Sequence, residues 1–204
     1  MKHHTTFALT LTAVFMAILL LQSFVPDIGY IRIFPTLPAI TTVPLTIAVY
    51  GSLMGPKAGT QFGVFWGLTR LVLAYTQPGD IVSLLLFRNP FISLVPSIVA
   101  GLLAGLIVKK LTAGPFRHEK LRYVVAGVIT SLANTLLVIG LTALVFNGRP
   151  ETIAKYLGNT GMPLLWLLMS ALAVNGLLEA VFTGLMTPLI VTPLQYVVRK
   201  GQRR

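Results

Sequence analysis

The chain has 204 residues, of which 55% are hydrophobic and 10% are charged, and its mean hydropathy is +0.83. A soluble domain of this size does not need so much apolar surface, so the composition predicts an integral membrane protein. The net charge of +11 does not indicate a nucleic-acid-binding protein, because the basic residues stand in short loops between apolar runs.

The apolar runs predict a single membrane domain, an all-α bundle of six transmembrane helices. They are Thr5–Val25, Pro38–Met54, Lys57–Tyr75, Phe91–Val108, Tyr123–Phe146 and Met162–Val198. The first, third, fourth and fifth have the length that spans a bilayer, about 20 residues. Pro38 and Pro44 interrupt the second run, so we expect it to be kinked or partly loop. Pro188 and Pro193 are expected to bend the long sixth run.

The distribution of basic residues predicts the orientation of the bundle. When the six helices are threaded up and down, 11 of the 16 Lys and Arg residues fall on one side. They are Lys2, Lys57, Lys109, Lys110, Arg117, Lys120, Arg122, Arg199, Lys200, Arg203 and Arg204. Lys and Arg are enriched in cytoplasmic loops, so both termini are expected in the cytoplasm.

A stripe of glycines begins just before the third run, continues into it and ends at a cation. Gly55, Gly59, Gly63 and Gly67 recur at every fourth residue, a spacing that places them on one face of a helix. Such a face lets a second membrane helix approach closely. Arg70 follows within the predicted span, where a charge is costly and therefore indicates function.

The sequence lacks the residues of an enzyme. It has no phosphate-binding loop, no H-E-x-x-H zinc motif and no cysteine, and its only acids are Asp27, Asp80, Glu119, Glu151 and Glu179. We therefore expect no catalytic site, no metal and no cofactor.

Polar residues inside the predicted spans are the candidates for a ligand site. Glu179 is the only acid within an apolar run, Asn175 lies one helical turn before it, and Asn134 lies near the middle of the fifth run. These residues either form interhelical hydrogen bonds and an internal ion pair, or line a polar cavity that is open to the outside. Arg70 either joins that cavity or extends to the outer interface.

The outer loops favour a cavity. The segment at residues 28–45, which contains Thr41 and Thr42, is rich in Pro and Thr and suits a lid over a ligand. Arg88 and Asn89 are expected at the outer mouth, where Arg88 is either a carboxylate partner or an ordinary solvated charge. Trp66, one turn before Arg70, either lines the cavity or faces lipid.

These features together resemble the substrate-binding S components of energy-coupling factor (ECF) vitamin transporters. The matching residues are Ala13 and Ala17, Ala39–Thr42, Gly55–Gly59, Gly63, Phe65–Leu71, Asn89–Ser93, Ser131–Gly140, and Asn175 with Glu179. The AITT, GPKAG and NTLLVIG stretches are most similar to the pantothenate-type branch of that family.

The resemblance implies a transport subunit without its own ATPase. It would capture pantothenate at the outer face and dock through Ala13 and Ala17 on a membrane coupling subunit with two ATP-binding subunits. Arg88 or Arg70 would bind the vitamin carboxylate. Asn134, Asn175 and Glu179 would form hydrogen bonds with the hydroxyls and the amide. The further residues assigned to the substrate site are Thr41, Thr42, Trp66 and Asn89.

Other functions remain open at this point. A different vitamin with a flat ring would stack on Trp66, Tyr50 or Phe87. A self-sufficient ion-coupled transporter would need several acids within the membrane, and the sequence offers only Glu179. The pair Ala13 and Ala17 is also compatible with packing inside the bundle.

Overall fold

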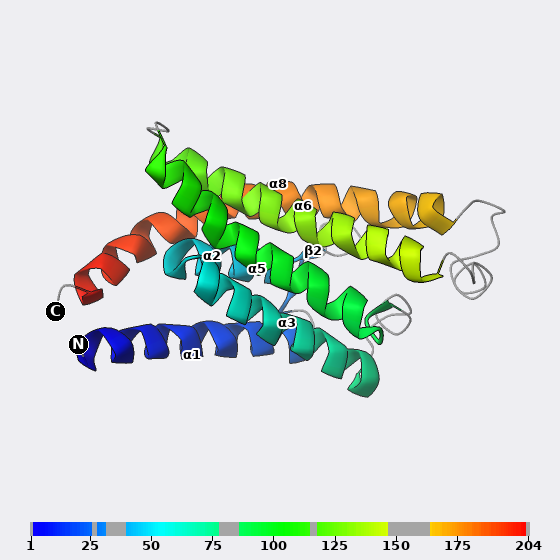
Figure 1. The fold of residues 1–204 in the computed structure, drawn as a ribbon, viewed down its shortest axis with the longest axis horizontal. Helices are drawn as coiled ribbons and strands as arrows, with labels where there is room; N and C mark the ends of the chain where they lie inside the picture. Colours follow the sequence, from blue (N-terminus) through cyan, green and yellow to red (C-terminus); the bar gives the residue numbers. More distant parts are fainter. Residues whose placement is uncertain are drawn as a thin grey trace.

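The computed structural model describes residues 2–25, 28–31, 40–77, 86–114, 118–146 and 164–202. This part of the chain forms six α-helices (Figure 1): α1 (Lys2–Phe24), α2 (Val43–Met54), α3 (Pro56–Thr76), α5 (Pro90–Ala113), α6 (Glu119–Phe146) and α8 (Leu164–Gln202). The prediction of an all-helical protein with six helices is therefore confirmed.

Two short strands, which the sequence did not indicate, stand in the segment between α1 and α2. Strands β1 (Tyr30–Ile31) and β2 (Ile40–Thr41) pair antiparallel, with Tyr30 opposite Thr41. Helix α2 begins only at Val43, with Pro44 in its first turn, where the missing N–H of proline removes no helical hydrogen bond. The second apolar run is thus part strand and part helix, where the prediction was a kink or a partial loop, and Pro38 lies outside the described residues.

Four helical stretches among the described residues are long and apolar enough to cross a membrane. They are Thr6–Phe24, Pro90–Ala113, Glu119–Phe146 and Ala173–Val198. Helix α2 is apolar but shorter. Helix α3 has 21 residues, a spanning length, but it is not among the four, because Lys57, Gln61 and Arg70 make it less apolar.

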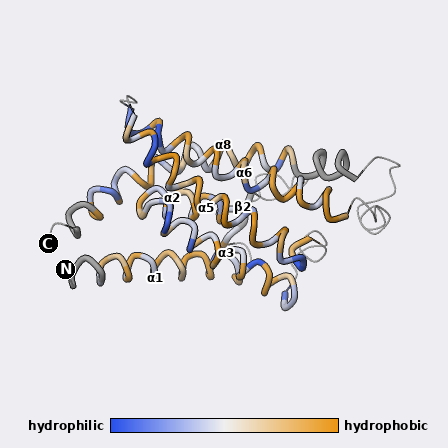
Figure 2. Tube along the Cα trace, in the orientation of Figure 1, coloured by the Kyte–Doolittle hydropathy of each residue, from blue (hydrophilic) through white to orange (hydrophobic). Residues whose placement is uncertain are grey.

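The outer surface of the bundle is apolar. Leu9, Leu144 and Leu189 are each about two-thirds exposed or more, at 67%, 76% and 67%. Figure 2 shows hydrophobic residues along the lengths of the helices and hydrophilic residues where α5 ends and α6 begins. Leucines exposed to this extent on three different helices are typical of a surface that faces lipid.

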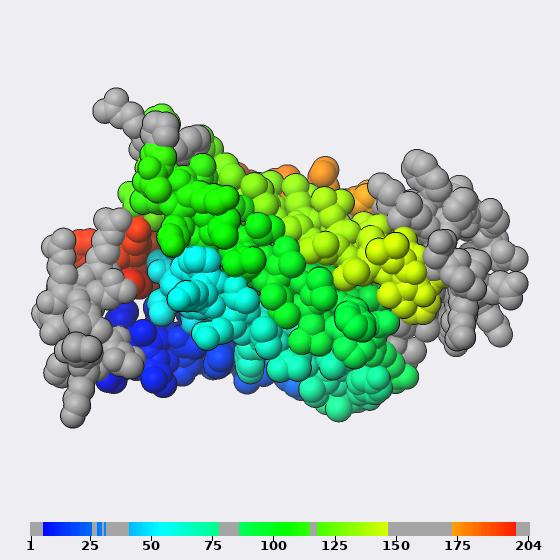
Figure 3. All heavy atoms as spheres, in the orientation of Figure 1, coloured from blue at the N-terminus to red at the C-terminus, as the bar shows by residue number. Residues whose placement is uncertain are grey.

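Helix α5 lies at the centre of one face, between α3 and α6, and α8 packs against the opposite side of α6 (Figures 1 and 3). The first residues of α1 and the last residues of α8 lie at the same end of the bundle (Figure 1). Helix α8 changes direction in its C-terminal part, which contains Pro188 and Pro193. Termini at one end fit an even number of spans; that this end is cytoplasmic stays a prediction.

Helices α3 and α5 approach to backbone contact along the glycine stripe. A Cβ placed on Gly59 would lie 3.1 Å from the Gly101 carbonyl carbon, and one on Gly67 would lie 2.9 Å from the Leu94 Cα. Ser93 Oγ also donates to the Gly67 carbonyl oxygen over 2.7 Å. Gly55 is the exception in the stripe: it lies before α3 with φ of 85°, a left-handed conformation that favours glycine at the turn from α2.

Candidate functional site

Arg70 points into the bundle and joins α3 to α5 and α6. Its Nη1 donates to Asn134 Oδ1 over 3.2 Å and to Ser97 Oγ over 3.4 Å. The guanidinium carbon lies 3.7 Å from the ring centre of Phe87 and 4.9 Å from that of Trp66. Hydrogen bonds and aromatic faces are what a cation needs when it is withdrawn from water, so Arg70 is held toward the interior and not toward the outer interface.

Asn134 and Trp66 are both buried beside Arg70. Asn134 is 7% exposed and Trp66 is 4% exposed, so neither side chain faces lipid. Trp66 packs within an aromatic and aliphatic core that includes Tyr50 and Phe62, whose ring centres are 4.3 Å apart. The tryptophan therefore forms one wall beside the Arg70 guanidinium.

Glu179 is the centre of a second polar group, built from α8 and β2. Its Oε1 accepts hydrogen bonds from the Thr41 N–H over 2.9 Å, the Thr41 hydroxyl over 2.6 Å and the Asn175 Nδ2 over 3.2 Å. The side chain is only 6% exposed. A buried carboxylate requires donors of this kind, and they tie the segment before α2 to the middle of α8.

Thr42 turns away from Glu179. Its Oγ1 accepts from Gln22 Nε2 over 2.9 Å and donates to the Gly29 carbonyl oxygen over 3.2 Å. The two threonines of the AITT stretch thus have different partners: Thr41 contacts α8, and Thr42 contacts the end of α1.

Arg88 and Asn89 lie at the junction of α3 and α5. Arg88 Nε donates to the Ala74 carbonyl oxygen over 3.0 Å, and its guanidinium lies 5.3 Å from the centre of the Tyr75 ring. Asn89 caps α5, because its Oδ1 accepts from the Phe91 N–H over 2.9 Å. In the described part of the chain, the hydrogen bonds of these two side chains do not lead to Arg70 or Glu179.

Several residues near the two polar groups were not predicted from the sequence. Ser97 contacts Arg70 directly, and its spacing of four from Ser93 and Gly101 on one face of α5 is the signal that could have found it. Asn175 Oδ1, Ser131 Oγ and Thr183 Oγ1 are buried without a hydrogen-bond partner among the described residues. Ser131 is one turn from Asn134 and Thr183 is one turn from Glu179, so α6 and α8 each carry a further buried polar side chain close in sequence to the two polar groups.

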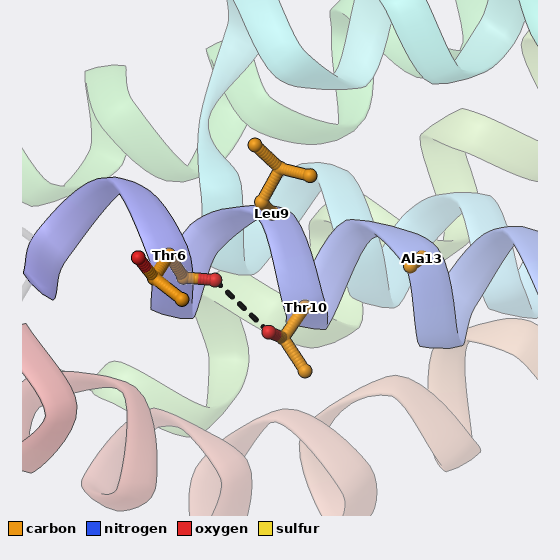
Figure 4. A pocket seen from close by; sticks show the side chains of 4 residues that line it. All are labelled: Thr6, Leu9, Thr10 and Ala13. Carbon is orange, nitrogen blue, oxygen red and sulfur yellow. Dashed lines mark hydrogen bonds between the residues drawn. The ribbon is translucent and has the colours of Figure 1, made fainter.

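Ala13 and Ala17 lie on the outside of α1, and both are exposed. Ala13 lines a shallow hollow together with Thr6, Leu9 and Thr10 (Figure 4). Within it, Thr10 Oγ1 donates to the Thr6 carbonyl oxygen over 3.0 Å. This hollow contains neither Arg70 nor Glu179, so the two alanines belong to a surface and not to the polar groups of the interior.

Comparison with known families decides what kind of protein contains these groups. A family model described as the substrate-specific component of ECF transporters matches residues 7–191. The chain belongs to this family. The S component is therefore a multi-pass membrane protein and a transport subunit, not an enzyme, as the resemblance of its motifs implied.

A curated relative is similar over nearly the whole length of this S component. The pantothenate transporter PanT of Leuconostoc mesenteroides subsp. mesenteroides is 34% identical over 191 residues, which cover 91% of the chain and 90% of PanT.

Proposed function

We propose that this S component captures pantothenate at the outer face of a bacterial plasma membrane. It passes the vitamin inward when it is docked on a membrane coupling subunit with two ATP-binding subunits. The moderate identity to PanT supports this substrate. In this proposal the chain is a single membrane domain with both termini in the cytoplasm.

The observation that carries the proposal is the convergence of buried and partly buried polar side chains within an otherwise apolar bundle. Arg70, Asn134 and Ser97 meet from α3, α6 and α5, and Glu179 meets Asn175 and Thr41. Such groups are costly within a membrane and are typical of a substrate site.

The chemistry of pantothenate matches this set of residues. The vitamin has one carboxylate, two hydroxyls and one amide. The planar guanidinium of Arg70 would bind the carboxylate with two parallel hydrogen bonds. Glu179 would accept from a hydroxyl, while Asn134 and Asn175 would each donate and accept, the free Oδ1 of Asn175 included.

Arg70 is a better carboxylate partner than Arg88. Arg70 is partly buried among side chains of three helices, whereas Arg88 is exposed. A charged hydrogen bond is also stronger where water is excluded. We therefore assign Arg88 and Asn89 to the entrance, where Asn89 fixes the start of α5.

Calorimetry on the purified S component tests the proposal with a matched pair of arginine variants. Arg70→Ala should weaken pantothenate binding by at least about tenfold, because a buried charged hydrogen bond contributes about 1.5–3 kcal/mol. Arg88→Ala should change the affinity by less than about threefold. If both variants bind within twofold of the parent, the site lies elsewhere.

Two further measurements separate the proposal from its alternatives. In a competition panel of unlabelled vitamins, only pantothenate itself or a close precursor should displace the bound pantothenate. Displacement by a flat aromatic vitamin would favour the stacking surface of Trp66 and Phe87. Accumulation of substrate by the S component alone in liposomes would instead indicate a self-sufficient transporter.

A further inference from the structure

The end of α1 is joined to the start of α2 by one side chain, Gln22. Its Nε2 donates to Thr42 Oγ1 over 2.9 Å, and its Oε1 accepts from Thr46 Oγ1 over 2.8 Å. Both threonines are buried, at 9% and 5% exposed. The two halves of the amide are thus both used, so the geometry fixes the side chain in one orientation.

A backbone contact closes the same unit. The Gly29 carbonyl oxygen accepts from the Thr42 N–H over 2.8 Å as well as from the Thr42 hydroxyl. A Cβ on Gly29 would lie 2.9 Å from the Gln22 carbonyl carbon, so residue 29 packs directly on the last turns of α1. Gln22, Gly29 and Thr42 therefore hold one another in place.

The neighbouring residue, Thr41, is held on the opposite side. Thr41 ends strand β2, and Thr42 already has helical backbone angles as the N-cap of α2. The Thr42 side chain contacts Gln22 of α1, while Thr41 contacts Glu179 of α8. Thr41 donates both its N–H and its hydroxyl to Glu179. The two threonines share a peptide unit, so a shift of Thr42 moves the donors of Thr41 relative to the carboxylate.

We propose that Gln22 is a positioning residue of the ligand site, which acts through Thr42 and Thr41 on Glu179. Among the described residues, the hydrogen bonds of the Gln22 side chain go to Thr42 and Thr46 and not to Glu179. This inference rests on the proposed function in one respect, the participation of Glu179 in pantothenate binding.

A double-mutant cycle tests the route through Thr41. Gln22→Met keeps the length of the side chain but removes its donor and acceptor, and it should weaken pantothenate binding about tenfold in calorimetry. Thr41→Val should weaken binding by a similar factor. If Gln22 acts through Thr41, the two effects do not multiply, and the double variant binds within about threefold of Thr41→Val.

Thr12→Val is the matched control. Thr12 also joins α1 to α2, because its Oγ1 forms a hydrogen bond of 2.9 Å with the Tyr50 hydroxyl, but this contact does not lead to Thr42. Removal of this hydrogen bond by Thr12→Val should lower the melting temperature about as much as Gln22→Met does. The affinity for pantothenate should stay within twofold of the parent protein. An unchanged affinity of Gln22→Met, or effects of Gln22→Met and Thr41→Val that multiply, would overturn the inference.

A ligand-free measurement separates this inference from the proposed function. The chain has no cysteine, so Ile28→Cys, at a position 55% exposed, accepts a single spin label. The label should become more mobile in the Gln22→Met background and not in the Thr12→Val background. If the parent protein does not bind pantothenate, the proposed function fails, whereas equal label mobility in all three backgrounds refutes the positioning role of Gln22.

Discussion

The contact between α3 and α5 predicts a large effect from the smallest possible change, Gly59→Ala. The new Cβ would lie 3.1 Å from the Gly101 carbonyl carbon, and the carbonyl oxygen is closer still. Both neighbours are backbone atoms, which no side-chain rotation can move. The helices would have to separate by about 1 Å, and a gap of that size loses a quarter to a half of each dispersion contact along the interface.

Overpacking of this kind costs about 1–3 kcal/mol. For a protein of this length, a cost of about 2 kcal/mol lowers the melting temperature by about 4–8 °C. The assay is thermal unfolding of the purified protein in detergent, followed by the loss of monodisperse protein with temperature. Gly140→Ala in α6 is the matched control, because a Cβ there meets no heavy atom within 4 Å.

Gly140→Ala should leave the melting temperature unchanged or raise it, because alanine is the better helix former by about 0.5–1 kcal/mol. A Gly59→Ala variant as stable as Gly140→Ala would show that α3 and α5 are not in backbone contact. The reasoning about the glycine stripe would then be refuted.

Two other predictions concern the surface and the orientation of the bundle. Ala17→Leu should leave the affinity for pantothenate within twofold of the parent and abolish ATP-dependent uptake, since the residue lies on the exposed face of α1. Equal loss of binding and uptake would contradict a docking role. Single cysteines introduced by His3→Cys and Gln202→Cys should react with a membrane-impermeant maleimide in inverted vesicles and not in intact cells, and reaction of either one in intact cells would contradict cytoplasmic termini.

Hydropathy was sufficient to predict the helices, because each apolar run must satisfy its own backbone hydrogen bonds within the bilayer. The same reasoning found Arg70, Asn134 and Glu179, since polar side chains stand out in apolar runs. The ends of the helices were less predictable: α5 continues through Lys109 and Lys110 to Ala113, where hydropathy no longer distinguishes helix from loop.

The partners of the polar residues could not be predicted from the sequence. The contact of Thr41 with Glu179 joins residues 138 positions apart, and no periodicity reports such a pairing. Gln22 went unnoticed because a glutamine at the end of an apolar run is common. The roles of Arg88 and Asn89 depend on which backbone groups lie within reach, which only the packing of α3 against α5 determines.

Each polar group combines residues from both halves of the chain, and this has a consequence for biosynthesis. The chain emerges from the ribosome with its N-terminus first. Arg70 is therefore made before its partner Asn134, and Thr41 is made before its partner Glu179. Until α6 and α8 are translated, the arginine and the threonine have to be accommodated by water, lipid head groups or the insertion machinery. The last helix to be made thus completes the assembly of the polar interior, and a nascent chain that ends before α8 has the glycine-packed pair α3 and α5 but no Glu179.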